Sequence, residues 1–159
     1  GGATLYVKKP ASSSYIAYGS SKTVNKTDTN GLYSFYAKDN VGNRSATYYV
    51  YLDSELPVGT IKNASGTTLT KEYTNGAFSY SATDSGSGIN YLQYKKPSST
   101  TWTSYTSGTS ISASSANGTY QFRAVDKAGN ISATKSITLD SSKPTGELYD
   151  GNGNLASGG

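Results

Sequence analysis

The sequence predicts an all-β protein built from β-sandwich domains, and three observations lead to that prediction. The 159 residues are rich in Gly, Ser, Thr and Asn and include 15 Tyr, a mixture that suits half-buried strands and tight turns. Apolar residues alternate with polar ones in short segments bounded by turn residues, which is the period of a strand. The chain also repeats itself after 87 residues, a period too long for a solenoid turn and suited to a small sandwich.

The repeat defines the expected domain organisation. Sixteen of the thirty positions between residues 30 and 59 are identical 87 residues later. In this register Gly1 aligns with Gly88, in mid-repeat, and residues 144–159 align with residues 57–72. We therefore expect a partial domain over residues 1–53, a complete domain over residues 54–140, and a linker with the first strand of a following repeat over residues 141–159.

The first half of the complete domain reads as three strands. Residues 60–63 are predicted as a short first strand, and "AFSYSAT" at residues 77–83 alternates in the strand period. A loop, "DSGSG", separates it from the strand predicted over residues 89–95. That strand ends before Pro97, which has no N–H to donate to a sheet.

The second half reads as four further strands. Residues 102–106 and 110–113 are short alternating segments, and the longer strands are predicted over residues 119–125 and 133–139. Between these two lies "DKAGN", which recurs as "DNVGN" from Asp39. We expect a tight turn in which the Asp side chain accepts bonds from backbone amides and the Gly adopts a positive φ.

Alternation also predicts which face of each strand is buried. In the complete domain the buried residues are expected to be Leu92, Tyr94, Tyr120, Phe122, Ala124, Ile137 and Leu139. The corresponding row in the first copy is Leu5, Val7, Tyr33, Phe35, Ala37, Val50 and Leu52. A slip of one residue would expose the whole row, so the register is well determined.

The first copy lacks the two strands that begin a repeat, so its core is expected to be open. Three explanations remain open. The chain is a fragment of a longer array, residues 144–159 of an identical chain supply a missing strand, or part of the first copy is disordered.

Composition excludes several classes of function. With no Cys and no His, the chain has neither a thiolate nor the commonest general base and metal ligand. The ten carboxylates lie in different predicted loops and strands, and a filled sandwich has no cleft for a carboxylate pair, so we do not expect an enzyme. The net charge is +4 without a basic run, which argues against nucleic-acid binding. No segment is apolar enough to insert into a membrane.

The segments "GINYLQYKKPSSTTWTSY", "NGTYQFRAVDKAGNIS" and "ITLDSSKP" resemble the bacterial immunoglobulin-like repeats of cell-surface and secreted proteins. The first copy departs from the pattern at Tyr15, where the family has Trp. The resemblance covers nearly the whole chain and implies tandem extracellular modules that act as stalks, spacers or parts of adhesins. It carries no catalytic residues. The low charge and the lack of Cys agree with an extracellular location.

One face of the first copy is a candidate binding surface. Its outward positions on adjacent strands include Tyr6, Tyr36, Tyr49 and Tyr51, where the second copy is polar. Tyrosine offers a flat stacking surface with a polar tip, which suits a glycan or a surface protein. Two alternatives remain: ordinary cross-strand pairing of tyrosines, and packing on a neighbouring domain.

The junction between the two copies is a candidate Ca²⁺ site, the only cofactor considered. Asp53 and Glu55 lie at the linker, and Asp84, Asp126 and Asn130 lie in loops expected at the same end of the next domain. Oxygen atoms that converge in this way are the ligands Ca²⁺ prefers. The alternative is that these are ordinary turn acids. Taken together, the sequence favours a non-catalytic spacer, with an adhesin or carbohydrate-binding module as the second interpretation.

Overall fold

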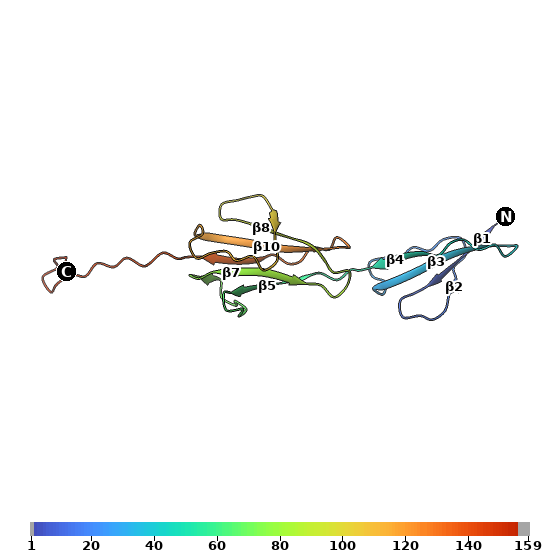
Figure 1. Cartoon of the computed structure of the whole chain (residues 1–159), viewed down its shortest axis with the longest axis horizontal. Coiled ribbons are helices and arrows are strands. Elements are labelled where there is room, and N and C mark those ends of the chain that lie inside the picture. The colour runs from blue at the N-terminus through green and yellow to red at the C-terminus, as the bar shows by residue number, and fades with distance from the viewer. Residues whose placement is uncertain (1, 156–159) are drawn as a thin grey trace.

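The computed structural model describes residues 2–155. Two parts of the chain lie outside the described residues: residue 1, and residues 156–159 at the end of the segment predicted to begin a following repeat. The described chain is all-β, with eleven strands in three hydrogen-bonded sheets. It is elongated, with one sheet at the N-terminal end, two packed sheets in the middle and an extended tail at the C-terminal end (Figure 1). No helix in this part of the chain is long and apolar enough to cross a bilayer.

The first sheet is antiparallel and has the order β2-β1-β3-β4. Its strands are β1 (Ala3–Lys8), β2 (Ile16–Ala17), β3 (Gly31–Asp39) and β4 (Tyr48–Leu52). The register places Val7 opposite Phe35 and Tyr33 opposite Val50. These residues therefore share one face, as the alternation predicts.

The central unit consists of two sheets. The larger has the order β6-β11-β10-β8-β9 and the smaller pairs β5 with β7. The bounds are β5 (Val58–Asn63), β6 (Tyr73–Thr74), β7 (Phe78–Thr83), β8 (Ile89–Lys95), β9 (Thr103–Tyr105), β10 (Gly118–Asp126) and β11 (Lys135–Leu139). All pairs are antiparallel except β6 with β11. In Figure 1 the layer of β5 and β7 lies against that of β8 and β10, the arrangement of a β-sandwich.

The core of the central unit lies between these two layers. Phe122 from β10 is fully buried. Its ring stacks on Tyr80 of β7 at 5.0 Å and meets Tyr105 of β9 edge-on at 5.2 Å. Burial of each such side chain contributes about 1.5–3 kcal/mol. Of the predicted inward residues, Leu92, Tyr120, Phe122, Ala124, Ile137 and Leu139 are buried, and Tyr94 is partly buried against this core.

Two elements differ from the prediction. Residues 110–113 do not form a strand, and only Ile111 bridges to Phe78. The reason is a turn directly after Ile111, in which the amide of Ser115 donates to the carbonyl of Ser112 (2.9 Å). The sequence also gave no indication of β6. This strand lies parallel to β11, where the amide of Thr138 donates to the carbonyl of Glu72 (2.8 Å).

The first sheet has one open face. No second sheet packs on it among residues 2–155. One end is covered by the loop before β3, because the Tyr33 hydroxyl donates to the carbonyl of Thr29 (2.9 Å) and both Val7 and Tyr33 are buried. At the other side Tyr48 and Val50 of β4 remain exposed. Ile16 of β2, which pairs with Val7, is exposed at the opposite edge. The expected open core is therefore found at both edges of the sheet and is most extensive along β4.

Several contacts recur 87 residues apart. The hydroxyl of Tyr120 donates to the carbonyl of Ala116 (3.0 Å) as that of Tyr33 donates to Thr29. The Asp39 turn also matches its second copy: Asp39 Oδ1 accepts from the amide of Asn43 (2.8 Å) and Gly42 has a φ of 98°. In the second copy of the turn, Gly129 has a φ of 94°. The positive φ predicted for this glycine is therefore confirmed in both places.

Candidate functional site

The link between the first sheet and the central unit is centred on Asp53, the residue after β4. Asp53 is buried. Its Oδ1 accepts from the amide of Glu55 (3.0 Å), and its Oδ2 accepts from the amide of Ser87 (2.6 Å). The end of β4 is thus hydrogen-bonded to the loop between β7 and β8.

A second loop meets the same residue. The Nδ2 of Asn130, in the turn after β10, donates both to Asp126 Oδ2 (2.7 Å) and to the backbone carbonyl of Asp53 (3.0 Å). Asp126 is fully buried. The side-chain amide of Asn130 therefore makes one hydrogen bond within the turn and one to the linker.

Asp84 completes the cluster. Its Oδ2 accepts from the amides of Gly86 (3.1 Å) and Gly88 (2.7 Å). Its Oδ1 is buried without a hydrogen-bond partner. One oxygen atom from each of Asp53, Asp84 and Asp126 lies within 4.8 Å of the others. Residue 86 is glycine where the loop passes the Asp53 carboxylate, because any Cβ there would collide with it.

The electrostatics of this cluster are unfavourable for three unshielded anions. Hydrogen bonds from the Ser87 side chain and from the amides of Ser87 and Glu55 lower the pKa of Asp53, against the opposing effect of burial. Carboxylate oxygens within 4.8 Å of one another repel each other when both are ionised, and a bound cation would relieve that repulsion. These three oxygens are the atoms in the described chain that are placed to hold a cation.

Three of the four residues predicted for Ca²⁺ are thus brought together, and the fourth is not part of the cluster. Glu55 instead accepts a hydrogen bond from the hydroxyl of Ser85. Sequence reasoning missed Ser87, which carries no pattern of its own. Asn130 lies at the linker, as its loop position predicts, but its side-chain amide donates to the Asp53 carbonyl and does not offer an oxygen to a cation.

The four predicted tyrosines lie on one face of the first sheet. Tyr6 and Tyr36 are opposite each other on β1 and β3, and their rings stack with centroids 4.9 Å apart. Tyr49 and Tyr51 of β4 are 64% and 51% exposed. Because Tyr49 pairs with Ser34 and Tyr51 with Leu32, the two rings stand on the side of the sheet that carries Tyr36.

The stack already has partners of its own. The guanidinium of Arg44 lies 3.7 Å from the centroid of the Tyr36 ring, and Tyr15 meets that ring edge-on at 4.8 Å. The central unit repeats this arrangement with Arg123 4.3 Å from the Trp102 ring. Tyr6 and Tyr36 are therefore packed within the protein, while Tyr49 and Tyr51 are available to a partner.

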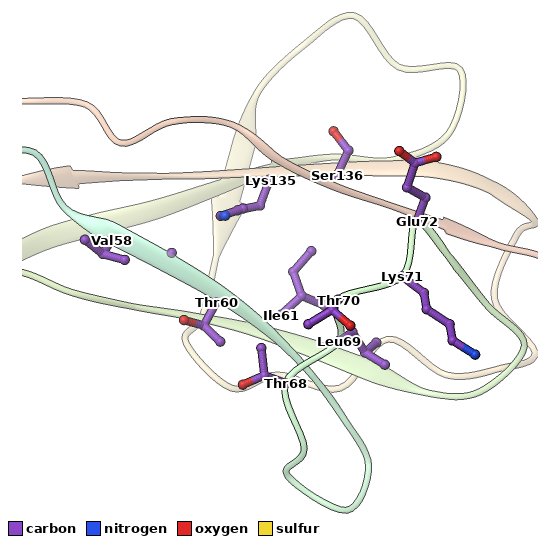
Figure 2. A pocket seen from close by; sticks show the side chains of 11 residues that line it. Val58, Thr60, Ile61, Thr68, Leu69, Thr70, Lys71, Glu72, Lys135 and Ser136 are labelled. Atoms are coloured by element: carbon purple, nitrogen blue, oxygen red, sulfur yellow. The ribbon is translucent and has the colours of Figure 1, made fainter.

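A separate hollow of about 550 Å³ lies in the central unit between β5, the segment 68–72 and the start of β11. Figure 2 shows its lining, in which the charged side chains of Lys71, Glu72 and Lys135 point in different directions. The remaining lining is mostly Thr and apolar side chains. Nothing there converges on a bound group, so we do not assign a function to this hollow.

A comparison of the chain with protein-family models and with curated protein sequences finds no match. The linker and the aromatic face are therefore the features from which a function is inferred.

Proposed function

We propose that this chain is a non-catalytic structural module, part of a stalk or spacer made of tandem immunoglobulin-like domains in a bacterial surface or secreted protein. The observation that carries the proposal is the linker at Asp53. A spacer must transmit orientation from one domain to the next, and a buried, hydrogen-bonded linker restricts the hinge motion that free linkers allow.

Two features support the immunoglobulin-like assignment. The larger sheet places a short parallel strand beside the last strand, and a tyrosine hydroxyl near the start of β10 bonds back to the chain four residues upstream, as in the tyrosine corner of such domains. The same bond at Tyr33 supports treating residues 1–53 as a partial second copy.

The experiment that tests a rigid spacer is small-angle scattering with backbone NMR relaxation on the full chain. We expect one elongated particle in which both parts tumble together. The double variant Asp53→Ala, Asn130→Ala should shorten the mean end-to-end distance and separate the tumbling times of the two parts. The matched control is Asp140→Ala, which changes the equivalent residue at the end of β11. Independent tumbling in the unmodified chain would refute the proposal.

A second candidate function is a glycan- or protein-binding module, and the exposed pair Tyr49 and Tyr51 favours it. Aromatic rings exposed side by side mark interaction surfaces. A glycan array followed by NMR titration tests this function. Binding that disappears in the Tyr49→Ser, Tyr51→Ser variant and persists in Tyr91→Ser would support a binder. A chain that binds no glycan or surface protein, or binds equally well without these rings, remains a spacer only.

A further inference from the structure

The tail after β11 contains a turn with the same local structure as the turn after β5. Residues 144–155 align with residues 57–68 of the repeat. After β5 the amide of Asn63 donates to the carbonyl of Thr67 (2.9 Å). In the tail the amide of Asp150 donates to the carbonyl of Asn154 (2.8 Å). The bridge between Lys62 and Thr68 recurs between Tyr149 and Leu155.

The two segments differ in what lies against them. Ile61 of β5 is 6% exposed because β5 packs across β10 and β11, whereas the equivalent Leu148 is 74% exposed. On the first sheet, by contrast, a sheet face lacks a strand to cover it. Val50 is 52% exposed, whereas its equivalent in β11, Ile137, is 2% exposed because β5 and β7 cover it. The chain thus carries an uncovered extended segment at one end and an uncovered face at the other.

We propose that the tail of one copy docks on the open face of the first sheet of a second copy, as β5 docks on β10 and β11. Leu148 would take the place of Ile61, against Val50 of the second copy. The contact joins the C-terminal end of one molecule to the N-terminal end of the next, so it is heterologous and does not close on itself.

Charge and the existing linker both favour this occupant. Residues 1–52 hold six Lys and Arg against two Asp, while residues 144–159 hold Glu147 and Asp150 and no basic residue. The docked tail would also bring Asp140, the equivalent of Asp53, to the turn at Asn43, the equivalent of Asn130. The side-chain amide of Asn43 is then placed to donate to the Asp140 carbonyl, which extends the linker geometry across the two molecules.

The test is sedimentation equilibrium of the full chain between about 10 μM and 1 mM, since a single docked strand buries little surface and belongs to the weak class of interfaces. We expect concentration-dependent growth beyond a dimer. Leu148→Asp, in the exposed tail, should abolish it, and so should Val50→Asp. Tyr49→Asp, next in sequence to Val50 but on the opposite face of β4, should leave it unchanged. A chain that stays monomeric at about 1 mM would overturn the proposal.

Mixing variants tests the direction of the contact. Leu148→Asp has an intact open face and Val50→Asp an intact tail, so together they should form a 1:1 dimer although neither associates alone. If Val50→Asp does not fold, a synthetic peptide of residues 141–155 replaces it, and its binding to the Leu148→Asp chain should shift NMR signals at Val50 more than at Tyr49. Association that survives Leu148→Asp would show a face-to-face dimer and overturn the proposal. A failure here leaves the rigid linker of the spacer untouched.

Discussion

Asp53 holds two loops of the central unit with different atoms. Its carboxylate accepts from Ser87 and its carbonyl accepts from Asn130. A longer or uncharged side chain would keep the carbonyl contact and lose the other. The orientation of the linker therefore depends on the ionised carboxylate of a single residue.

The pKa of Asp53 gives the pH dependence a definite sign. Hydrogen bonds from Ser87 lower this pKa below the usual 3.8 of an aspartate, so the folded state binds fewer protons than the unfolded state. The stabilisation is complete above the unfolded value and is lost as the pH falls through the lower folded value. We expect the contribution of Asp53 to the free energy of unfolding to be constant near neutral pH and to decline below about pH 4.

Asp53→Asn should remove this part of the acid dependence, and a side-chain carboxylate titration by NMR measures it directly. A folded pKa of Asp53 at or above the usual 3.8 of an aspartate would contradict the prediction.

Removing the hydroxyl group of two buried tyrosines should change the free energy of unfolding in different ways. The Tyr80 hydroxyl has no hydrogen-bond partner, so Tyr80→Phe should leave the free energy of unfolding unchanged or raise it by up to about 1 kcal/mol. The Tyr105 hydroxyl accepts from the amide of Tyr80 (3.0 Å) and donates to the carbonyl of Thr109. Tyr105→Phe should cost about 1–2 kcal/mol. Urea unfolding followed by circular dichroism compares the two, and equal effects would disprove the assignment.

At the scale of elements, the long strands were predictable and the short contacts were not. The strand over residues 89–95 and the buried rows of β10 and β11 follow from alternation alone, because a slip would expose every apolar side chain. β6 has two residues and so has no alternation to detect, and its parallel partner is set by packing of the whole unit. At the linker, shared loop positions predicted Asp84 and Asp126, but the side chain of Glu55 turns to Ser85, which spacing does not encode.

The two copies of one aromatic position test how much the second layer contributes. Phe122 of β10 is fully buried between two sheets, while its equivalent Phe35 in β3 is only partly buried on a half-open face. Phe122→Ala should lower the free energy of unfolding of the central unit by about 3–5 kcal/mol. Phe35→Ala should cost about 1–2 kcal/mol, since it leaves little closed cavity. Hydrogen exchange resolved by residue measures both, and equal losses would mean that the first sheet is covered after all.

At the scale of the whole molecule, the acidic cluster predicts a response to calcium. Sites of this kind in extracellular modules bind with dissociation constants of about 0.1–1 mM. Calcium at about 10 mM should then stabilise the central unit by about 1–3 kcal/mol and raise its melting temperature by several degrees.

Asp84→Asn should abolish the response to calcium, because Asp84 supplies the buried Oδ1 without a partner. Asp39→Asn should retain it, since Asp39 makes the same turn as Asp126 in the first sheet but is not part of the cluster. A melting curve that calcium does not move would identify the cluster as turn acids held by hydrogen bonds alone.

The parallel pairing of β6 with β11 bears on how the central unit resists a pull on its two ends. Tension enters the central unit through β5, which is paired with β7. Once β5 yields, the tension passes to β6 and leaves through the chain after β11, so it drags two parallel neighbours in opposite directions along their length. Their hydrogen bonds, from Thr138 to Glu72 and from Asp140 to Thr74, are then loaded together in shear and cannot open one after another as in a peeled hairpin. Two strands loaded in shear break their hydrogen bonds together, so this pair should resist a pull better than a hairpin with the same number of bonds, a behaviour that suits the proposed spacer.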